Sequence, residues 1–189
     1  MKLLIASDIH GSARFAELFL EAVRREQPDR ILLLGDLLYH GPRNALPDDY
    51  DTKRTMEILN SLKDRIVAVR GNCDSEVDQM VLDFPIMNRY EMLEADGLRL
   101  FATHGHGYNP LNPPPFVEMD VLLNGHTHVP ALKQYEEYLY VNPGSVSIPK
   151  GGSDHSYAVL EGGVFSLRRL QDGTEYDRCA VGRRQTQNE

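Results

Sequence analysis

Short apolar runs alternate with longer amphipathic segments in the first half of the chain. Lys2–Ser7, Arg30–Leu34 and Arg65–Val69 are mostly aliphatic, which is typical of strands buried on both faces. Ser12 to Pro28 and Thr52–Leu62 carry apolar residues at helical spacing, and Ser12 is suited to cap the first of these helices. This order of strand, helix, strand, helix and strand predicts a parallel sheet covered by helices.

The second half of the chain consists of short strand-like runs separated by turns. These runs are Tyr90–Ala95, Leu98–Thr103, Val121–Asn124, Ala131–Tyr135, Tyr138–Val141, Tyr157–Leu160 and Val164–Leu170. Glycine-containing turn signals such as Asp96-Gly97 and Gly162-Gly163 between them predict antiparallel hairpins. The two halves together predict an α/β (α+β) domain in which two mixed sheets face each other with helices outside. We expect one domain over residues 1–189, with a frayed polar tail at 181–189.

Composition narrows the classes of function. At 189 residues the chain is long enough for one domain with a substantial core. Its formal net charge of −8 argues against broad electrostatic contact with nucleic acid or anionic lipid. No stretch approaches the ~20 apolar residues that span a bilayer, and Asp8 interrupts the apolar start before it reaches signal-peptide length. We therefore expect a cytoplasmic protein without a membrane partner.

The two cysteines do not form a recognisable motif. Cys73 and Cys179 lie far apart and without CxxC spacing. The sequence therefore indicates neither a disulfide framework nor a thiolate zinc site. A single disulfide between them is disfavoured by the expected compartment.

Five apolar runs are each followed by an acid, an amide or an imidazole. The residues at these positions are Asp8 and His10, Asp36, Asn72, His104, and His126 with His128. Because the carboxyl ends of parallel strands converge on one crevice, we expect these side chains to meet. Each one alone has an ordinary structural explanation, since an acid after a strand is more often a turn former. As an ordered set they fit two divalent ions bridged by a carboxylate, and they suit manganese, iron or zinc better than soft metals.

The same residues carry a resemblance to a known family. The series Asp8-Ile9-His10, Gly35-Asp36, Gly71-Asn72-Cys73-Asp74, His104-Gly105-His106 and Gly125-His126-Thr127-His128 resembles the calcineurin-like metallophosphoesterases. The resemblance runs from residue 1 to about residue 170. Segments His40–Pro47, Gly71–Met80 and Asn142–Gly151 are similar to the YfcE-type bacterial phosphodiesterase subgroup in particular.

This resemblance implies a fold, a metal centre and a reaction. The fold is a four-layer αββα sandwich with a dinuclear site at strand ends. The metals are two divalent ions, manganese first, with zinc, iron, nickel or magnesium as alternatives. Their implied ligands are Asp8, His10 and His128 for one ion, Asn72, His104 and His126 for the other, and Asp36 as the bridge that positions a hydroxide. That hydroxide would attack a small phosphodiester.

Three further residues are candidates with open alternatives. Many relatives carry a histidine where Cys73 stands, at the position of the leaving group, and we favour a packing role for this thiol over a chemical one. Arg43 lies in a loop from which its guanidinium could bind a substrate phosphate, although a solvated loop arginine is equally open. His106 is expected to support the ligands from behind or to be structural. Lys150 lacks the spacing of a P-loop lysine and is discounted.

Two rival functions remain open at this stage. The retromer scaffold subunit resembles this family and uses its surface for binding, whereas this chain has competent residues at all seven ligand positions. A nuclease acting on polynucleotides is disfavoured by the acidic charge and by the lack of a basic stripe. The partners we expect are thus a small phosphodiester and, as one option, further copies of the chain.

Overall fold

Two mixed β-sheets pack against each other in the computed structural model, which describes residues 1–115 and 117–181. One sheet has six strands in the order β11-β10-β9-β1-β2-β3. They are β1 Leu3–Ala6, β2 Arg30–Leu33, β3 Ile66–Ala68, β9 Ser156–Glu161, β10 Val164–Arg169 and β11 Glu175–Ala180. Strands β1, β2 and β3 are parallel, and β9, β10 and β11 continue the sheet in antiparallel fashion.

The second sheet has five strands in the order β4-β5-β6-β8-β7. They are β4 Glu91–Ala95, β5 Leu98–Ala102, β6 Val121–Leu123, β7 Ala131–Gln134 and β8 Leu139–Asn142. Its centre, β5-β6-β8, is parallel, and an antiparallel strand closes each edge. The predicted pair of mixed sheets is therefore confirmed.

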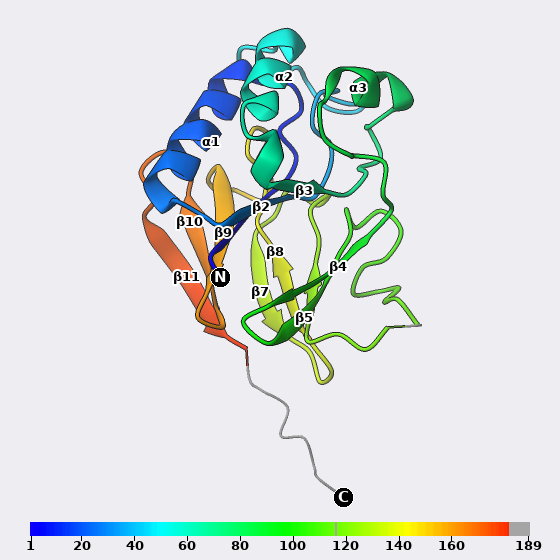
Figure 1. Cartoon of the computed structure of the whole chain (residues 1–189), viewed down its shortest axis with the longest axis vertical. Helices are drawn as coiled ribbons and strands as arrows, with labels where there is room; N and C mark the ends of the chain where they lie inside the picture. Colours follow the sequence, from blue (N-terminus) through cyan, green and yellow to red (C-terminus); the bar gives the residue numbers. More distant parts are fainter. Residues whose placement is uncertain (116, 182–189) are drawn as a thin grey trace, which may run out of the picture.

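The described helices gather on one side of the six-stranded sheet (Figure 1). They are α1 Ala13–Glu26, α2 Thr52–Asn60, α3 Glu76–Val81 and the 3₁₀ turn η1 Lys63–Arg65. Ser12 caps α1 as predicted, because its side chain accepts a hydrogen bond from the backbone N–H of Phe15 at 3.4 Å. On the outer face of the second sheet, the described residues form no helix. Aromatic side chains cover that face instead, including Phe101, Tyr138 and Tyr140.

Alternate residues of β1 belong to different hydrophobic cores. Leu4 and Ala6 pack with α1 and α2, whereas Leu3 and Ile5 pack between the two sheets. All four are buried, which explains why this strand reads as a continuous apolar run. The helix layer and both sheets are thus joined through the central strands, and the loops after those strands are held on a rigid base.

Two elements differ from the sequence expectations. Helix α3 was not predicted, because Val77 and Met80 are 68% and 83% exposed and give it no apolar stripe toward a core. Strand β11 was not predicted either, because it is a mostly exposed edge strand that carries three charged residues and no continuous apolar run. No described helix is both long and apolar enough to cross a membrane. The tail expected at 181–189 lies, beyond residue 181, outside the described residues.

Candidate metal centre

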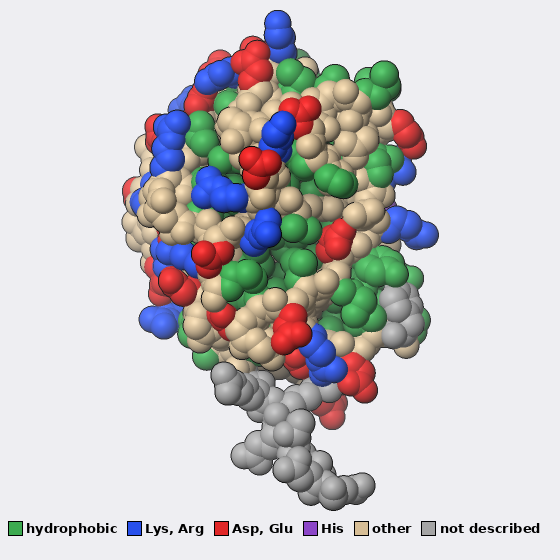
Figure 2. All heavy atoms as spheres, viewed as in Figure 1, with side chains coloured by type: hydrophobic (Ala, Val, Ile, Leu, Met, Phe, Trp, Pro, Cys, Tyr) green, Lys and Arg blue, Asp and Glu red, His purple; other side chains and the backbone are tan. Residues whose placement is uncertain are grey.

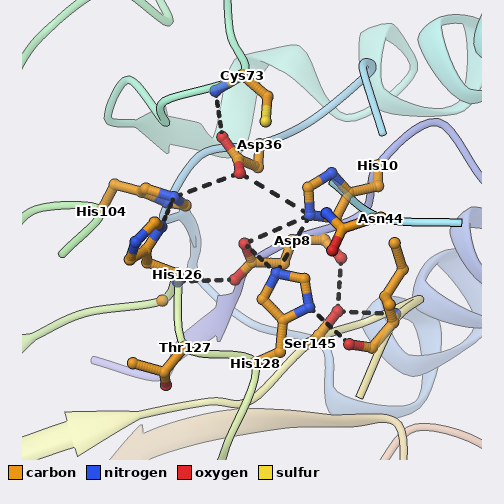
Figure 3. Close-up of polar contacts among 12 residues, drawn as sticks. Asp8, His10, Asp36, Asn44, Cys73, His104, His126, Thr127, His128 and Ser145 are labelled. Carbon is orange, nitrogen blue, oxygen red and sulfur yellow. Dashed lines mark hydrogen bonds and ion pairs between the residues drawn. The ribbon is translucent and has the colours of Figure 1, made fainter. Parts of the chain in front are cut away.

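The predicted ligands sit directly after five strand ends and converge between the two sheets (Figure 3). Strands β1, β2 and β3 supply Asp8, His10, Asp36 and Asn72, and strands β5 and β6 supply His104, His126 and His128. Hydrogen bonds join the loops of the two sheets at this point. The His104 ring hydrogen-bonds through Nδ1 to the Leu34 carbonyl at 2.6 Å, and the His126 backbone N–H donates to Asp8 Oδ2 at 3.0 Å. The structure therefore brings all seven residues into one cluster.

One half of the cluster is formed by Asp8, His10 and His128. Asp8 Oδ1 lies 3.3 Å from His128 Nε2 and 3.7 Å from His10 Nε2. The two Nε2 atoms lie 3.3 Å from each other. One ligand atom from each of the three residues thus falls within a sphere that one ion can fill.

The other half surrounds the Nε2 atom of His104. Asn72 Oδ1 lies 3.1 Å from it, His126 Nδ1 lies 3.2 Å away and Asp36 Oδ2 lies 3.4 Å away. The same Asp36 oxygen is 3.8 Å from His10 Nε2 in the first half. Asp36 therefore lies between the two groups of ligands, as the family resemblance implies for a bridge.

The hydrogen bonding of the histidine rings fits a cation. His10, His104 and His128 each direct Nδ1 to a backbone carbonyl oxygen, which can only accept. These carbonyls belong to Tyr39, Leu34 and Ile148, at 2.8, 2.6 and 2.6 Å. In the neutral ring the proton is therefore on Nδ1, and Nε2 presents its lone pair to the cluster. Asp8 Oδ1 is buried there without a hydrogen-bond partner among the described residues, so the site concentrates electron pairs that a metal ion would use.

Electrostatics point in the same direction. Burial alone would lower the pKa of His104, but the hydrogen bond to Asp36 and the charges of Asp8 and Asp36 outweigh it and raise that pKa to about 9. Burial would raise the pKa of Asp8, yet its contacts with His10 and His128 bring the pKa far below its ordinary value. The cluster thus stabilises positive charge strongly, whether that charge is a proton or a metal ion.

Five of the seven residues adopt a left-handed backbone conformation. Their φ angles are 59° at Asp8, 49° at His10, 56° at Asp36, 65° at His126 and 60° at His128. Positive φ is uncommon outside glycine, costs free energy, and persists where the surroundings enforce it, often at functional sites. Here it turns each chain sharply after its strand, so that neighbouring side chains point into one cavity.

Asp74 is a supporting residue to which the sequence reasoning assigned no role. Its buried carboxylate accepts hydrogen bonds from the backbone N–H groups of Asp36, Leu37 and Gly71 at 2.8, 2.8 and 2.7 Å. Burial and the nearby Asp36 charge raise the pKa of Asp74, while the backbone donors oppose that rise. A side chain at Gly71 would collide with the Asp36 carboxylate. Gly71 and Asp74, the first and last residues of their motif, therefore both help to position Asp36. The place of Asp74 in that motif was the sequence signal that could have identified its supporting role.

A polar cleft of ≈490 Å³ opens on the cluster. Arg43, the predicted substrate ligand, lines it together with Asn72 and Cys73. Lys150 lines it as well, although the sequence reasoning discounted this residue. Neither Arg43 nor Lys150 forms an ion pair with a described residue. The sequence signal that could have identified Lys150 was its place in the segment similar to the YfcE-type subgroup.

Cys73 is half-buried at the edge of this cleft. Its backbone N–H donates to Asp36 Oδ1 at 2.8 Å, and Asn72 Nδ2 contacts its Sγ at 3.2 Å. Burial, followed by the Asp36 charge, raises the pKa of the thiol to about 12. The thiol is therefore neutral near pH 7, and the packing role that we favoured stays a prediction.

His106 lies beside the ligands and not among them. Its ring centroid is 5.5 Å from that of His104 and 6.1 Å from that of His126. Burial, and then the charges of His104, Arg89 and Arg70, lower its pKa. The side chain is exposed and lines a second pocket next to the cleft.

Comparison with known proteins adds a family to this geometry. The profile of the calcineurin-like phosphoesterase superfamily domain matches residues 1–162. The chain is 49% identical over 181 residues to phosphodiesterase YfcE of Escherichia coli K12, covering 96% of this chain and 98% of the relative. A solved structure of E. coli YfcE, described as a phosphoesterase, matches with a TM-score of 0.92 and 47% identity, over 96% of this chain and all of the other. Zinc-complexed Vps29 from Entamoeba histolytica matches with a TM-score of 0.64 over 96% of this chain and 100% of that one, and at 23% identity it shows the fold alone.

Proposed function

The chain belongs to the calcineurin-like phosphoesterase superfamily, and on that basis we propose that it is a phosphodiesterase with two divalent metal ions that hydrolyses a small phosphodiester. The observation that carries this proposal is the convergence of histidine ring nitrogens and carboxylate oxygens in one buried cluster. The relative with 49% identity is a phosphodiesterase, which supports the choice of reaction.

The residues divide into two ligand groups that share one carboxylate. Asp8, His10 and His128 would hold one ion, and Asn72, His104 and His126 the other, with Asp36 between them. Bound divalent ions supply a water nucleophile that is activated near neutral pH and neutralise charge on the phosphoryl oxygens. The donor set suits manganese, iron or zinc, and we place manganese first on the resemblance alone.

The protein contributes substrate binding and orientation around this centre. Arg43 and Lys150 present positive charge to the cleft in which a phosphate would approach the ligands. Arginine can bind phosphate oxygens through two parallel N–H donors, and lysine acts as a point charge. Asp36 is fixed from both sides, by the Cys73 backbone N–H and by the Asp74 clamp on its own backbone. These contacts pre-organise the site before substrate arrives.

The thiol at position 73 shapes the choice of substrate. A group with a pKa of about 12 is a weak proton donor near pH 7, so it offers little help to an alkoxide leaving group. Diesters and esters with activated aryl leaving groups need that help least. We therefore propose diesters over alkyl monoesters, while the cytoplasmic location and a homo-oligomer stay predictions.

Metal dependence tests the proposal directly. Protein stripped with a chelator and verified as metal-free should not hydrolyse bis(4-nitrophenyl) phosphate, and activity should return with Mn²⁺. Zn²⁺, Ni²⁺ and Mg²⁺ at equal concentration provide the comparison. Undiminished hydrolysis by the metal-free protein would refute the proposal, and so would a reconstituted protein that binds Mn²⁺ but turns over no diester.

A further inference from the structure

A second pocket adjoins the metal cluster and shares Asn72 with the cleft. It encloses ≈270 Å³. Its lining consists of Arg70, Gly71, Asn72, Arg89, Thr103, His106, Gly107 and Tyr108. Asn72 lines both this pocket and the cleft that contains Asp36 and Cys73, so the two hollows meet at a proposed metal ligand.

The pocket contains positive charge that the protein leaves largely uncompensated. Arg89 makes no ion pair with a described residue. Arg70 lies 4.0 Å from Glu76, whose side chain is 82% exposed, and such a solvated pair is worth little. Both arginines line this same pocket, together with His106. In a chain of net charge −8, one hollow that holds an unpaired arginine and an arginine paired only with a solvated acid indicates that a ligand supplies the anion.

We propose that this pocket binds an anionic group, a carboxylate or a second phosphate, carried by the ester arm of the substrate that stays on phosphorus. The inference rests on the proposed function and names the class of diester. Cys73, at the position assigned to the leaving group, lines the cleft, whereas the arginines line the second pocket. A phosphate held at the metal centre can therefore direct its leaving group to the cleft and its second arm to Arg70 and Arg89. A guanidinium fork matches either anion with two parallel hydrogen bonds.

The test compares esters that share a leaving group and differ in the second arm. The probes are 4-nitrophenyl propyl phosphate, 4-nitrophenyl 2-carboxyethyl phosphate and 4-nitrophenyl 2-(phosphonooxy)ethyl phosphate, each with the Mn²⁺-loaded protein. Because charge-assisted hydrogen bonds act on the arm alone, we expect kcat/KM to rise about 10–100-fold from the neutral arm to an anionic one. Most of that rise should be a fall in KM. A preference between the two anionic esters then tells carboxylate from phosphate.

Variants assign the preference to the pocket. Arg89 is suited to substitution because its side chain makes no hydrogen bond or ion pair with a described residue, whereas Arg70 donates from Nε to the Asp74 carbonyl at 3.2 Å. In Arg89→Gln the ratio of kcat/KM between anionic and neutral arms should drop about 10-fold, and Arg89→Lys should recover part of it. Arg24→Gln is the matched control, since Arg24 is an exposed arginine in the last turn of α1, well away from the site.

The possible results separate the two proposals. If the neutral ester is hydrolysed but an anionic arm gives no advantage, the pocket assignment is overturned and the phosphodiesterase stands. An advantage that persists in Arg89→Gln, or falls equally in Arg24→Gln, overturns the assignment as well. If the metal-loaded protein hydrolyses none of the three esters, the proposed function fails and this inference fails with it.

Discussion

Asp36 holds its two carboxylate oxygens in different environments. Oδ1 accepts the Cys73 N–H at 2.8 Å, and Oδ2 faces His104 at 3.4 Å and His10 at 3.8 Å. An asparagine keeps the shape of this side chain but removes the charge that would bridge two cations. In Asp36→Asn we therefore expect bound Mn²⁺ to fall to at most one ion per chain and kcat/KM to fall more than about 100-fold, since even residues behind the ligands are worth 10–100-fold.

The measurement is metal content by mass spectrometry together with hydrolysis of bis(4-nitrophenyl) phosphate. Asp36 lies at a strand end and not in a hydrophobic core, so its variant should melt within a few degrees of the metal-free wild type. Two bound ions and near-normal turnover in a folded Asp36→Asn protein would contradict the bridging assignment.

Cys73 gives a second prediction at this scale. Because the thiol is neutral and half-buried, Cys73→Ser should keep most of its activity toward an aryl diester. Cys73→His restores an imidazole at the leaving-group position and should raise monoesterase activity relative to diesterase activity. The gain should fall well short of the ~10²–10⁴-fold typical of acid–base assistance. A side-chain atom added at Gly41 would come within 2.9 Å of the thiol, so a larger side chain at 73 must displace that loop.

The assay compares kcat/KM for 4-nitrophenyl phosphate and bis(4-nitrophenyl) phosphate at matched metal content. Cys179→Ser on β11 is the control, because it removes the other half-buried thiol away from the site. A large loss of diesterase activity in Cys73→Ser alone would show a chemical role for the thiol. An unchanged ratio in Cys73→His would show that another feature sets the preference.

The sequence predicted the residues that converge in the cluster but not the residues that hold them in place. Asp8, Asp36 and the histidines each follow an apolar run, so their order alone predicted a site. Asp74 acts through backbone N–H groups of a different loop, and that relation exists only once β2 and β3 lie side by side. Arg70 and Arg89 are likewise brought together by the fold, since ordinary surface arginines look the same in a sequence.

Helix α1 is anchored at its end by a buried acid. Glu26, 5% exposed, accepts from the Tyr157 hydroxyl at 2.7 Å and from Arg168 at 2.8 and 2.9 Å, and Lys2 Nζ lies 3.0 Å away. It therefore ties α1 to β9, to β10 and to Lys2, the residue just before β1. Burial would raise the pKa of Glu26, but the contacts with Tyr157, Lys2 and Arg168 outweigh it and lower that pKa.

This anchor predicts a pH-dependent contribution to stability. A carboxyl whose pKa is lower in the folded state than in the unfolded state stabilises the fold at every pH above the unfolded pKa, which is near 4.5 for Glu26. That contribution is lost as the pH falls toward the folded pKa. Glu26→Gln should therefore lower the free energy of unfolding by about 1–3 kcal/mol at pH 7, and the difference from wild type should shrink below pH 4.5. Urea unfolding of the metal-free wild type and of metal-free Glu26→Gln at several pH values measures this difference in the free energy of unfolding. Glu21→Gln, an exposed acid on the same helix, is the control, and a difference that grows on acidification would contradict the assigned sign.

Elements with a clear face toward a core were the ones that the sequence predicted. The strands β1, β2 and β3 and the helices α1 and α2 bury continuous runs or stripes and were found within one or two residues of their bounds. Helix α3 depends on a capping box at Ser75 and Asp78, and β11 on pairing with β10. Such local capping and edge pairing leave little hydrophobic periodicity, so patterning could not show them.

At the scale of the molecule, the charge is acidic but mixed. Figure 2 shows Lys and Arg side chains interspersed with Asp and Glu over one face, and no continuous basic stripe crosses the described surface on that side. A long nucleic acid therefore has no extended positive complement on this face. The positive charge proposed to bind the substrate is local. It comes from Arg43 and Lys150 in the cleft and from Arg70 and Arg89 in the second pocket.

The two sheets meet at the proposed metal centre, and this arrangement links metal binding to the stability of the whole chain. Three strands of one sheet supply Asp8, His10, Asp36 and Asn72, and two strands of the other supply His104, His126 and His128. Ions held by both sets would join the sheets at the end where their loops are strained. The unfolded chain cannot present this arrangement, so binding energy becomes folding energy.

Manganese should therefore raise the melting temperature of the stripped protein. At a free concentration 100 times its Kd, one site contributes about 2.7 kcal/mol, which corresponds to roughly 5–10 °C for a domain of this size. Thermal melts with and without Mn²⁺ measure the shift, with KCl at equal ionic strength as the control. Asp36→Asn should lose more than half of it, because that carboxylate belongs to both ligand groups. Amide hydrogen exchange should slow in β3 and in β6 alike, since they lie in different sheets and the loop after each strand supplies proposed ligands. Slowing in one sheet alone would mean that the ions do not bridge the sheets.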